Sequence, residues 1–311
     1  MIRVVGANPA MDRVSTWPGL ELGAVNRAQK VAVVPGGKGF NVARAVVRLG
    51  EEATAYGFLG GHVGEALREM VVGDGVIDRH TTIAAGTRVC FIVVQPESGR
   101  STVLNEPGPA VAPDEIERFL EMLRSDCQAG DLVVLSGSLP DSVPATVAGE
   151  VVRIGAAARS RTVVDIHSEA LRHAVAQRPW MVKCNRHELD QLLDDDTDAD
   201  LPRAMQRLQG QGIAVVVVTL GAEGALIADD AGVARVRVPR IDEVNPTGSG
   251  DLLLAGLTVG IERGLTPREA LVLGAACGTA GATHLRPELP ASFEPEEWTS
   301  RIALERADGG W

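Results

Sequence analysis

The feature that most constrains the fold is an alternation of short valine- and isoleucine-rich runs with longer amphipathic segments. This alternation is typical of β-α-β units that build a parallel sheet. The expected strands are residues 2–5, 54–58, 132–135, 162–165, 181–183 and 213–219, the last of them apolar throughout and therefore central in the sheet. The expected helices are residues 41–49, 63–72, 114–126, 144–158, 201–211, 251–263, 267–284 and 294–304. We therefore predict an α/β fold in which helices flank both faces of a central, mostly parallel sheet.

Two stretches, residues 12–36 and 87–104, break the alternation because they carry strands of mixed polarity without long helices between them. We predict that they form a small β-sheet that projects from the main sheet as a lid. The alternative is an irregular edge extension of the main sheet. The sequence has no repeat, no low-complexity tract and no clear linker, so residues 1–311 are expected to form a single domain.

The composition disfavours several kinds of partner. A net charge of −11 and an aromatic content of 3% argue against nucleic acid, which is bound by basic fields and stacking side chains. The four cysteines are far apart and form no Cys-x-x-Cys pair, which favours a reducing, cytoplasmic setting. No apolar run approaches the roughly 18 residues of a membrane-spanning helix, so no membrane partner is expected. A small phosphorylated ligand remains compatible, because a few local cations suffice for it.

Residues 246–251 read Pro-Thr-Gly-Ser-Gly-Asp and precede an apolar, helix-like run. Successive N–H groups around Gly248, Ser249 and Gly250, opening onto a helix N-terminus, can cradle an anion. The Asp251 carboxylate cannot bind that anion, because like charges repel. It can instead take a proton from a nucleophile that attacks the anion. Phosphoryl transfer needs this pairing of an anion cradle and a base. The structural alternative is an N-capped helix after a glycine turn.

Two further motifs are candidates for sugar or phosphate binding. Residues 35–44 contain Gly-Gly-Lys-Gly before a helix, so that Gly37 and Lys38 bring N–H groups and an ammonium together. This is not a Walker A loop, and a purely structural glycine turn is the alternative. Asp12 follows the first strand, where open α/β sheets gather ligands. It can accept hydrogen bonds from ligand hydroxyls or cap a turn.

Two motifs after later strands are candidates for metal or nucleotide binding. Asn185 and Glu188 are three residues apart, so on a helical turn they share a face and can hold a hydrated Mg²⁺. The same spacing also describes a capping box. Residues 219–224 form a glycine-rich turn that leaves the expected central strand. That turn either approaches a nucleotide or is a hairpin corner.

The order of these motifs along the chain resembles that of the ribokinase/PfkB family of carbohydrate kinases, in its phosphosugar branch (1-phosphofructokinase and tagatose-6-phosphate kinase). The matching segments are residues 8–12, 36–44, 57–61 (Gly-Phe-Leu-Gly-Gly), 87–88 (Thr-Arg), 105–109 (Asn-Glu-Pro-Gly-Pro), 136–140 (Ser-Gly-Ser-Leu-Pro), 183–188, 219–224 and 245–251. The resemblance implies a ribokinase-like fold and a kinase that uses ATP and Mg²⁺ to phosphorylate a sugar phosphate.

The resemblance also implies roles for individual residues. Asp251 would be the catalytic base, and the N–H groups of residues 248–251 the anion hole. Asn185 and Glu188 would hold Mg²⁺ through water, and the residues along ATP would be Lys183, Thr219, Gly221 and Gly224. The sugar would be bound by Asp12, Gly37, Lys38 and Asn41. The phosphate of the acceptor would be bound by Arg88, Lys38 and Ser138.

The identity of the acceptor has several alternatives. Cys90 stands where this branch usually has asparagine, and a thiol is a poor hydrogen-bond partner, so the acceptor sugar is not fixed. A kinase for an unphosphorylated sugar or a nucleoside is the main alternative, and a non-catalytic phosphosugar-binding regulator is another. Lid strands with open edges often pair between subunits, which favours a homodimer through the lid.

Overall fold

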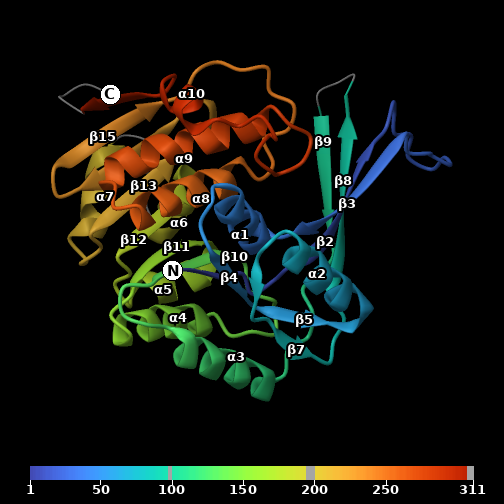
Figure 1. The fold of residues 1–311 in the computed structure, drawn as a ribbon, viewed down its shortest axis with the longest axis horizontal. Coiled ribbons are helices and arrows are strands. Elements are labelled where there is room, and N and C mark those ends of the chain that lie inside the picture. The colour runs from blue at the N-terminus through green and yellow to red at the C-terminus, as the bar shows by residue number, and fades with distance from the viewer. Residues whose placement is uncertain (97–99, 194–199, 307–311) are drawn as a thin grey trace.

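The computed structural model describes residues 1–96, 100–193 and 200–306 and has a ten-stranded sheet at its centre (Figure 1). Neighbouring strands are parallel from β6 to β13 and antiparallel from β13 to β16. The expectation of a mostly parallel sheet is therefore confirmed. In spatial order the strands are β16 (Ala303–Arg306), β15 (Gly232–Arg237), β14 (Ala225–Asp229), β13 (Val215–Thr219), β12 (Met181–Asn185), β11 (Arg161–Ile166), β10 (Leu132–Gly137), β1 (Ile2–Val5), β4 (Ala53–Tyr56) and β6 (Ile77–Asp78).

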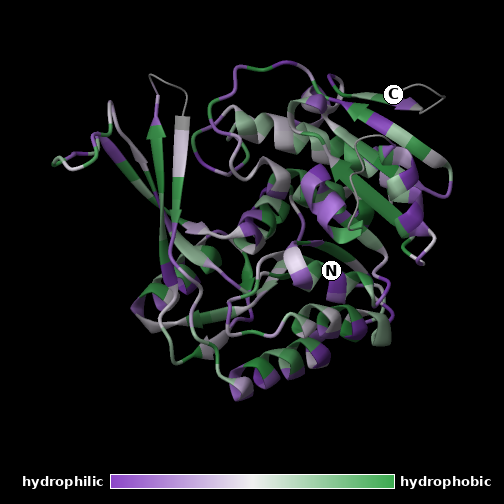
Figure 2. Ribbon diagram, turned by 180° about the vertical axis from the view of Figure 1, so that it is seen from behind, coloured by the Kyte–Doolittle hydropathy of each residue, from purple (hydrophilic) through white to green (hydrophobic). Residues whose placement is uncertain are grey.

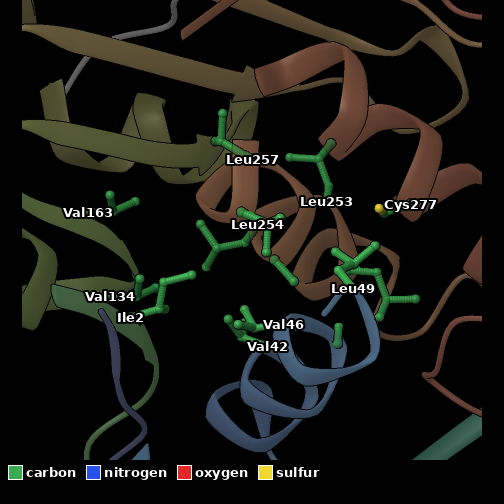
Figure 3. Packing of buried hydrophobic residues seen from close by; sticks show 14 of the residues in the cluster. Ile2, Val42, Val46, Leu49, Val134, Val163, Leu253, Leu254, Leu257 and Cys277 are labelled. Atoms are coloured by element: carbon green, nitrogen blue, oxygen red, sulfur yellow. The ribbon is translucent and has the colours of Figure 1, made fainter. Parts of the chain in front are cut away.

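Helices cover both faces of this sheet, and each face has its own apolar core. One core packs under α1 (Lys38–Arg48), α2 (Gly61–Gly73), α8 (Ser249–Glu262) and α9 (Pro267–Ala282). The other packs under α3 (Pro113–Asp126), α4 (Thr146–Ala157), α5 (Ser168–Val175), α6 (Arg186–Leu193) and α7 (Leu201–Gln209). Figure 3 shows Val42 and Val46 of α1 facing Leu254 of α8 within the first core. Central strands such as β13 contribute to both cores in alternation, with Val217 in the first and Val218 in the second.

A second sheet of four strands stands apart from the main body (Figure 1). Its order is β3 (Lys30–Gly36), β2 (Ala10–Thr16), β8 (Arg88–Gln95) and β9 (Arg100–Asn105), and we call it the projecting sheet. Val14, Val34, Ile92 and Val94 form a small apolar cluster within it, and apolar stretches along its strands are visible in Figure 2. The expectation of a small separate sheet from these two segments is confirmed. A further pair joins β5 (Phe58–Gly60) to β7 (Thr81–Ile83).

The C-terminal part of the chain differs from expectation. The predicted helix over residues 294–304 is wrong: α10 (Pro295–Thr299) is short, and the chain then enters strand β16. Pairing with β15 gives the backbone of these residues hydrogen-bond partners along the open sheet edge, and this outweighs the weak helical pattern. The structure also contains elements that are not predicted from the sequence, namely β14, β15, α5 and α6. No helix within the described ranges is long and apolar enough to cross a membrane.

Candidate active site

A cavity of about 380 Å³ lies where the carboxyl ends of the parallel strands meet the projecting sheet. Open α/β sheets bind ligands at this edge because the loops and helix N-termini converge there. Most of the residues singled out from the sequence line it, namely Asp12, Gly37, Lys38, Asn41, Arg88, Ser138, Lys183, Asn185, Glu188, Thr219, Gly248, Gly250 and Asp251. Six polar residues without an expected role line it too, namely Asn8, Asn105, Ser136, Asp165, His167 and Thr247.

Three expected site residues are not part of this lining: Ser249, Gly221 and Gly224. The Ser249 hydroxyl is buried and has no hydrogen-bond partner among the described residues. Gly224 has a φ of 92°, and a Cβ there would lie 1.9 Å from the Val236 carbonyl oxygen. The glycine is therefore required by the β13–β14 hairpin, which is the structural alternative for this turn.

The turn at Gly248 starts helix α8 and carries Asp251 in its first turn. Gly248 adopts a φ of 85°, the left-handed region, and a Cβ there would collide with Pro287. This geometry aims the helix N-terminus into the cavity. Asp251 is only 6% exposed, and its Oδ2 accepts a hydrogen bond of 2.8 Å from Asn41 Nδ2. A carboxylate is thus fixed beside a helix N-terminus, where the helix dipole favours anions.

Two carboxyl groups in the cavity have raised pKa values. Burial raises the pKa of Asp251 to about 6, although the Lys38 ammonium and the Asn41 hydrogen bond favour its ionised form. Burial also raises the pKa of Asp12 to about 6; Arg88 opposes this shift, and the charge of Asp251 adds to it. A base whose pKa lies just below neutrality is ionised at pH 7 and still able to hold a proton.

Asp165 lies between two lysines at the end of β11. Its Oδ2 lies 2.8 Å from Lys183 Nζ, and its Oδ1 lies 3.5 Å from Lys38 Nζ. Burial opposes ionisation, but the Lys183 and Lys38 charges outweigh it and lower the pKa of Asp165. Sequence reasoning gave this residue no role. The available signal was an aspartate at the carboxyl end of an apolar strand.

Arg88 is held by backbone oxygens at the base of the projecting sheet. Its Nη1 donates to the Glu106 carbonyl at 3.1 Å and its Nη2 to the Asn8 carbonyl at 2.9 Å. The Nε is buried and has no partner in the described part of the chain. The guanidinium is therefore fixed at the cavity wall, and its Nε–H donor is unused.

Asn185 and Glu188 form a reciprocal capping box at the start of α6. Glu188 N–H donates to Asn185 Oδ1 at 2.9 Å, and Asn185 N–H donates to Glu188 Oε2 at 2.8 Å. Both side chains line the cavity, and the capping box uses only Oε2 of the two carboxylate oxygens of Glu188. The described residues contain no group of three or more His, Cys, Asp or Glu that could hold a metal. The donors therefore fit a hydrated Mg²⁺ bound through water rather than a fully protein-ligated ion.

The N-terminal end of α1 is pressed against the end of β1 through two glycines. A Cβ on Gly39 would lie 2.6 Å from the Gly6 Cα, and a Cβ on Gly6 would lie 2.7 Å from the Gly39 Cα. This close approach sets the depth at which Lys38 and Asn41 enter the cavity.

Residues 2–290 of the chain match the pfkB family of carbohydrate kinases. The chain belongs to this family. It is 32% identical over 285 residues to a 1-phosphofructokinase of Bacillus subtilis (strain 168), covering 91% of this chain and 92% of that protein. The Escherichia coli phosphofructokinase-2 in complex with substrates and products superposes with a TM-score of 0.91 at 27% identity, covering 96% and 98% of the two chains. A Thermotoga maritima ribokinase superposes with a TM-score of 0.76 at 21% identity, covering 96% and 99%, which shows the shared ribokinase-like fold.

The family expected from the sequence motifs is confirmed, and with it the assignment as a carbohydrate kinase. Membership of a carbohydrate kinase family implies the use of ATP.

Proposed function

We propose that this protein transfers the γ-phosphoryl group of ATP to a hydroxyl of a phosphorylated ketohexose, of the fructose 1-phosphate or tagatose 6-phosphate type. The observation that carries the proposal is the buried Asp251, fixed by Asn41 at the start of α8 and facing the cavity. The phosphofructokinase names of the relatives support a phosphorylated acceptor.

In the proposed reaction Asp251 accepts the proton of the acceptor hydroxyl as its oxygen attacks the γ-phosphorus. A new oxygen–phosphorus bond forms, the bond to the bridging oxygen breaks, and ADP leaves. Within the turn, Ser249 N–H donates to the Pro246 carbonyl and Asp251 N–H to the Gly248 carbonyl. We therefore assign the anion hole chiefly to the N–H groups of Gly248 and Gly250, with the positive end of the α8 dipole behind them.

Cations near the projecting sheet would hold the phosphate already present on the acceptor. Arg88 supplies a fixed guanidinium with an unused Nε, and Lys38 and Ser138 line the same cavity. Asp12, Gly37 and Asn41 would bind the sugar. A second phosphate needs such local cations because the chain as a whole carries a net charge of −11.

The nucleotide would lie along the carboxyl edge of the main sheet, near Lys183 and Thr219, with Gly221 and Gly224 on the neighbouring hairpin. Asn185 and Glu188 would hold Mg²⁺ through water. When bound, the ion would neutralise charge on the transferred phosphoryl group. Closure of the projecting sheet as a lid over a single kinase domain would exclude water from the reaction. Exposed apolar residues on this sheet (Val31, Phe91, Val103 and Leu104) favour pairing with a second copy.

The test is an ADP-release assay at one ATP concentration with a panel of acceptors. Fructose 1-phosphate, tagatose 6-phosphate and fructose 6-phosphate are compared with fructose, ribose and adenosine, each with and without Mg²⁺. We expect Mg²⁺-dependent ADP release with at least one of the sugar phosphates. Turnover of only the unphosphorylated compounds would contradict the proposed acceptor. Binding of a sugar phosphate without any ADP release would favour the regulator instead.

A further inference from the structure

Asp165 occupies an unusual position for a carboxylate in a site built for phosphate. It is 1% exposed, lines the cavity at the end of β11 and pairs in register with Ser136 of β10. A carboxylate repels phosphate, so direct contact with the transferred group is unfavourable. Its hydrogen bonds explain its presence: each of its two oxygens accepts from a different lysine ammonium.

The two lysines come from elements far apart in the sequence. Lys183 lies on β12 and is 4% exposed, whereas Lys38 is the first residue of α1 and is partly exposed. Lys183 Nζ also lies 3.7 Å from the position that a Cβ would occupy on Gly250. The Lys183 ammonium is therefore beside the turn that we assign as the anion hole.

Two ammonium groups and one carboxylate give the three residues Lys38, Asp165 and Lys183 together one net positive charge. Two ammonium groups held close together without a counter-ion repel each other, and a buried ammonium without a partner is strongly unfavourable. With Asp165 between them, each amino group has a carboxylate oxygen as partner, and this fixes its position. A fixed cation aimed at a developing negative charge stabilises a transition state without reorganisation.

We propose that Asp165 is a positioning residue that holds Lys183 beside the transferred phosphoryl group and Lys38 on the side of the acceptor. This inference rests on the proposed phosphoryl transfer. Asp165 acts only through the lysines and neither takes the proton nor contacts the phosphate. The rival role is that of a metal ligand. If Asp165 were a metal ligand, removal of its charge would lower kcat by the same factor whether or not Lys183 is present.

A double-mutant cycle separates these roles. Asp165→Asn, Lys183→Met and the double variant are compared with wild type by kcat and by KM for ATP and fructose 1-phosphate, at several Mg²⁺ concentrations. We expect Asp165→Asn to lower kcat roughly 10- to 100-fold, because displacement of a catalytic group by about 1 Å costs up to this much. Both KM values should change far less. In the Lys183→Met background, Asp165→Asn should lower kcat much less than it does in wild type, because only its effect through the longer contact with Lys38 remains.

Multiplying effects in the double variant, or a higher Mg²⁺ requirement in Asp165→Asn, would overturn the proposal in favour of a metal ligand. Unchanged kcat in Asp165→Asn would also overturn it. The matched control is Asp229→Asn, which breaks another buried ion pair, with Arg268, outside the cavity lining. This control should lower the unfolding temperature and leave kcat unchanged. If Asp165→Asn does not fold, Asp165→Glu keeps the charge, moves it by one methylene and should show the same loss of kcat.

The double-mutant cycle can also be measured without an acceptor, with the dissociation constant of ATP as the readout. Titration calorimetry of ATP with the four proteins should show coupling between positions 165 and 183 that has the same sign as in kcat but is smaller, because the lysine charge acts mainly on the transition state. If the four proteins show this coupling in ATP binding but wild type phosphorylates no sugar phosphate, then the proposed acceptor is wrong and the positioning role stands. If the substitutions act independently in ATP binding and wild type turns over fructose 1-phosphate, then the positioning role fails alone.

Discussion

Two buried polar clusters lie in different parts of the central sheet, and they differ in how completely their groups are paired. Near the amino end of β1, Arg3 bonds to Asp131 and to the Tyr56 hydroxyl, which in turn bonds to Asp126. At the carboxyl edge, Asp165 joins two lysines, but the Ser136 hydroxyl and Asn41 Oδ1 are buried without partners in the described chain.

The comparison separates stability from function. Buried polar groups in folded proteins are nearly always hydrogen-bonded, so a fully paired cluster fits a structural role. Unpaired atoms that face a cavity indicate groups that a ligand would satisfy. We therefore expect substitutions at the Arg3 cluster to lower stability, and substitutions at the carboxyl edge to lower activity.

The largest effect is expected at Asp251. Asp251→Asn removes the proposed base but keeps a group that can pair with Asn41, so the fold should be retained. We expect kcat to fall roughly 10²- to 10⁴-fold, the range for loss of a general base. Steady-state kinetics measures this, with circular dichroism and thermal unfolding as controls. Turnover close to wild type would remove Asp251 from the mechanism.

The next largest effect tests the paired cluster. Arg3→Met leaves Asp131 buried without its guanidinium partner and should lower the free energy of unfolding by about 3–5 kcal/mol. The kcat of the folded fraction should not change. Urea unfolding at pH 7 gives the first quantity and the kinetic assay the second. Arg124→Met, on the exposed surface of α3, is the control and should stay within about 0.5 kcal/mol of wild type.

Substitution of Arg88 should separate the acceptor from the nucleotide. Arg88→Ala removes a charge-assisted donor and should raise KM for the sugar phosphate roughly 10- to 100-fold while leaving KM for ATP unchanged. Arg88→Lys keeps the charge but not the fork that binds the Asn8 and Glu106 carbonyls, and we expect an intermediate KM. An equal rise in both KM values would argue that Arg88 only supports the local structure.

The smallest effect concerns pH. Burial raises the pKa of Asp251 to about 6, so kcat/KM should fall about tenfold per pH unit below that value as the base becomes protonated. The folded state favours the protonated carboxyl, so its stabilising contribution is full below the unfolded pKa and is lost as pH rises through about 6. At pH 8 Asp251→Asn should therefore be more stable than wild type by about 1–3 kcal/mol. Equal stability at pH 8 would mean that burial does not penalise the charge.

The sequence predicted the parallel core of the fold because valine-rich strands and amphipathic helices carry strong periodic signals. It missed β14, β15 and β16, which add to an edge where pairing geometry rather than local preference decides the structure. Glycine motifs identified the parts of the cavity lining around Gly37 and Gly248, where the backbone has a positive φ. Asp165 was missed as a site residue because its role depends on the register of β10 and β11 and on the approach of α1, and no local pattern encodes either.

The contact between Gly6 and Gly39 has a consequence for how this protein can vary. A methyl group at either position would push the start of α1 away from the sheet, because the other Cα already fills that space. Substitution of the facing glycine cannot relieve this contact, since no residue is smaller than glycine. In a library of random variants selected for activity, both positions should therefore remain glycine. Any active variant that has lost one of these glycines should carry further substitutions around α1 that let the start of the helix move. The depth of the reactive groups is thus set by two residues that have no side chain.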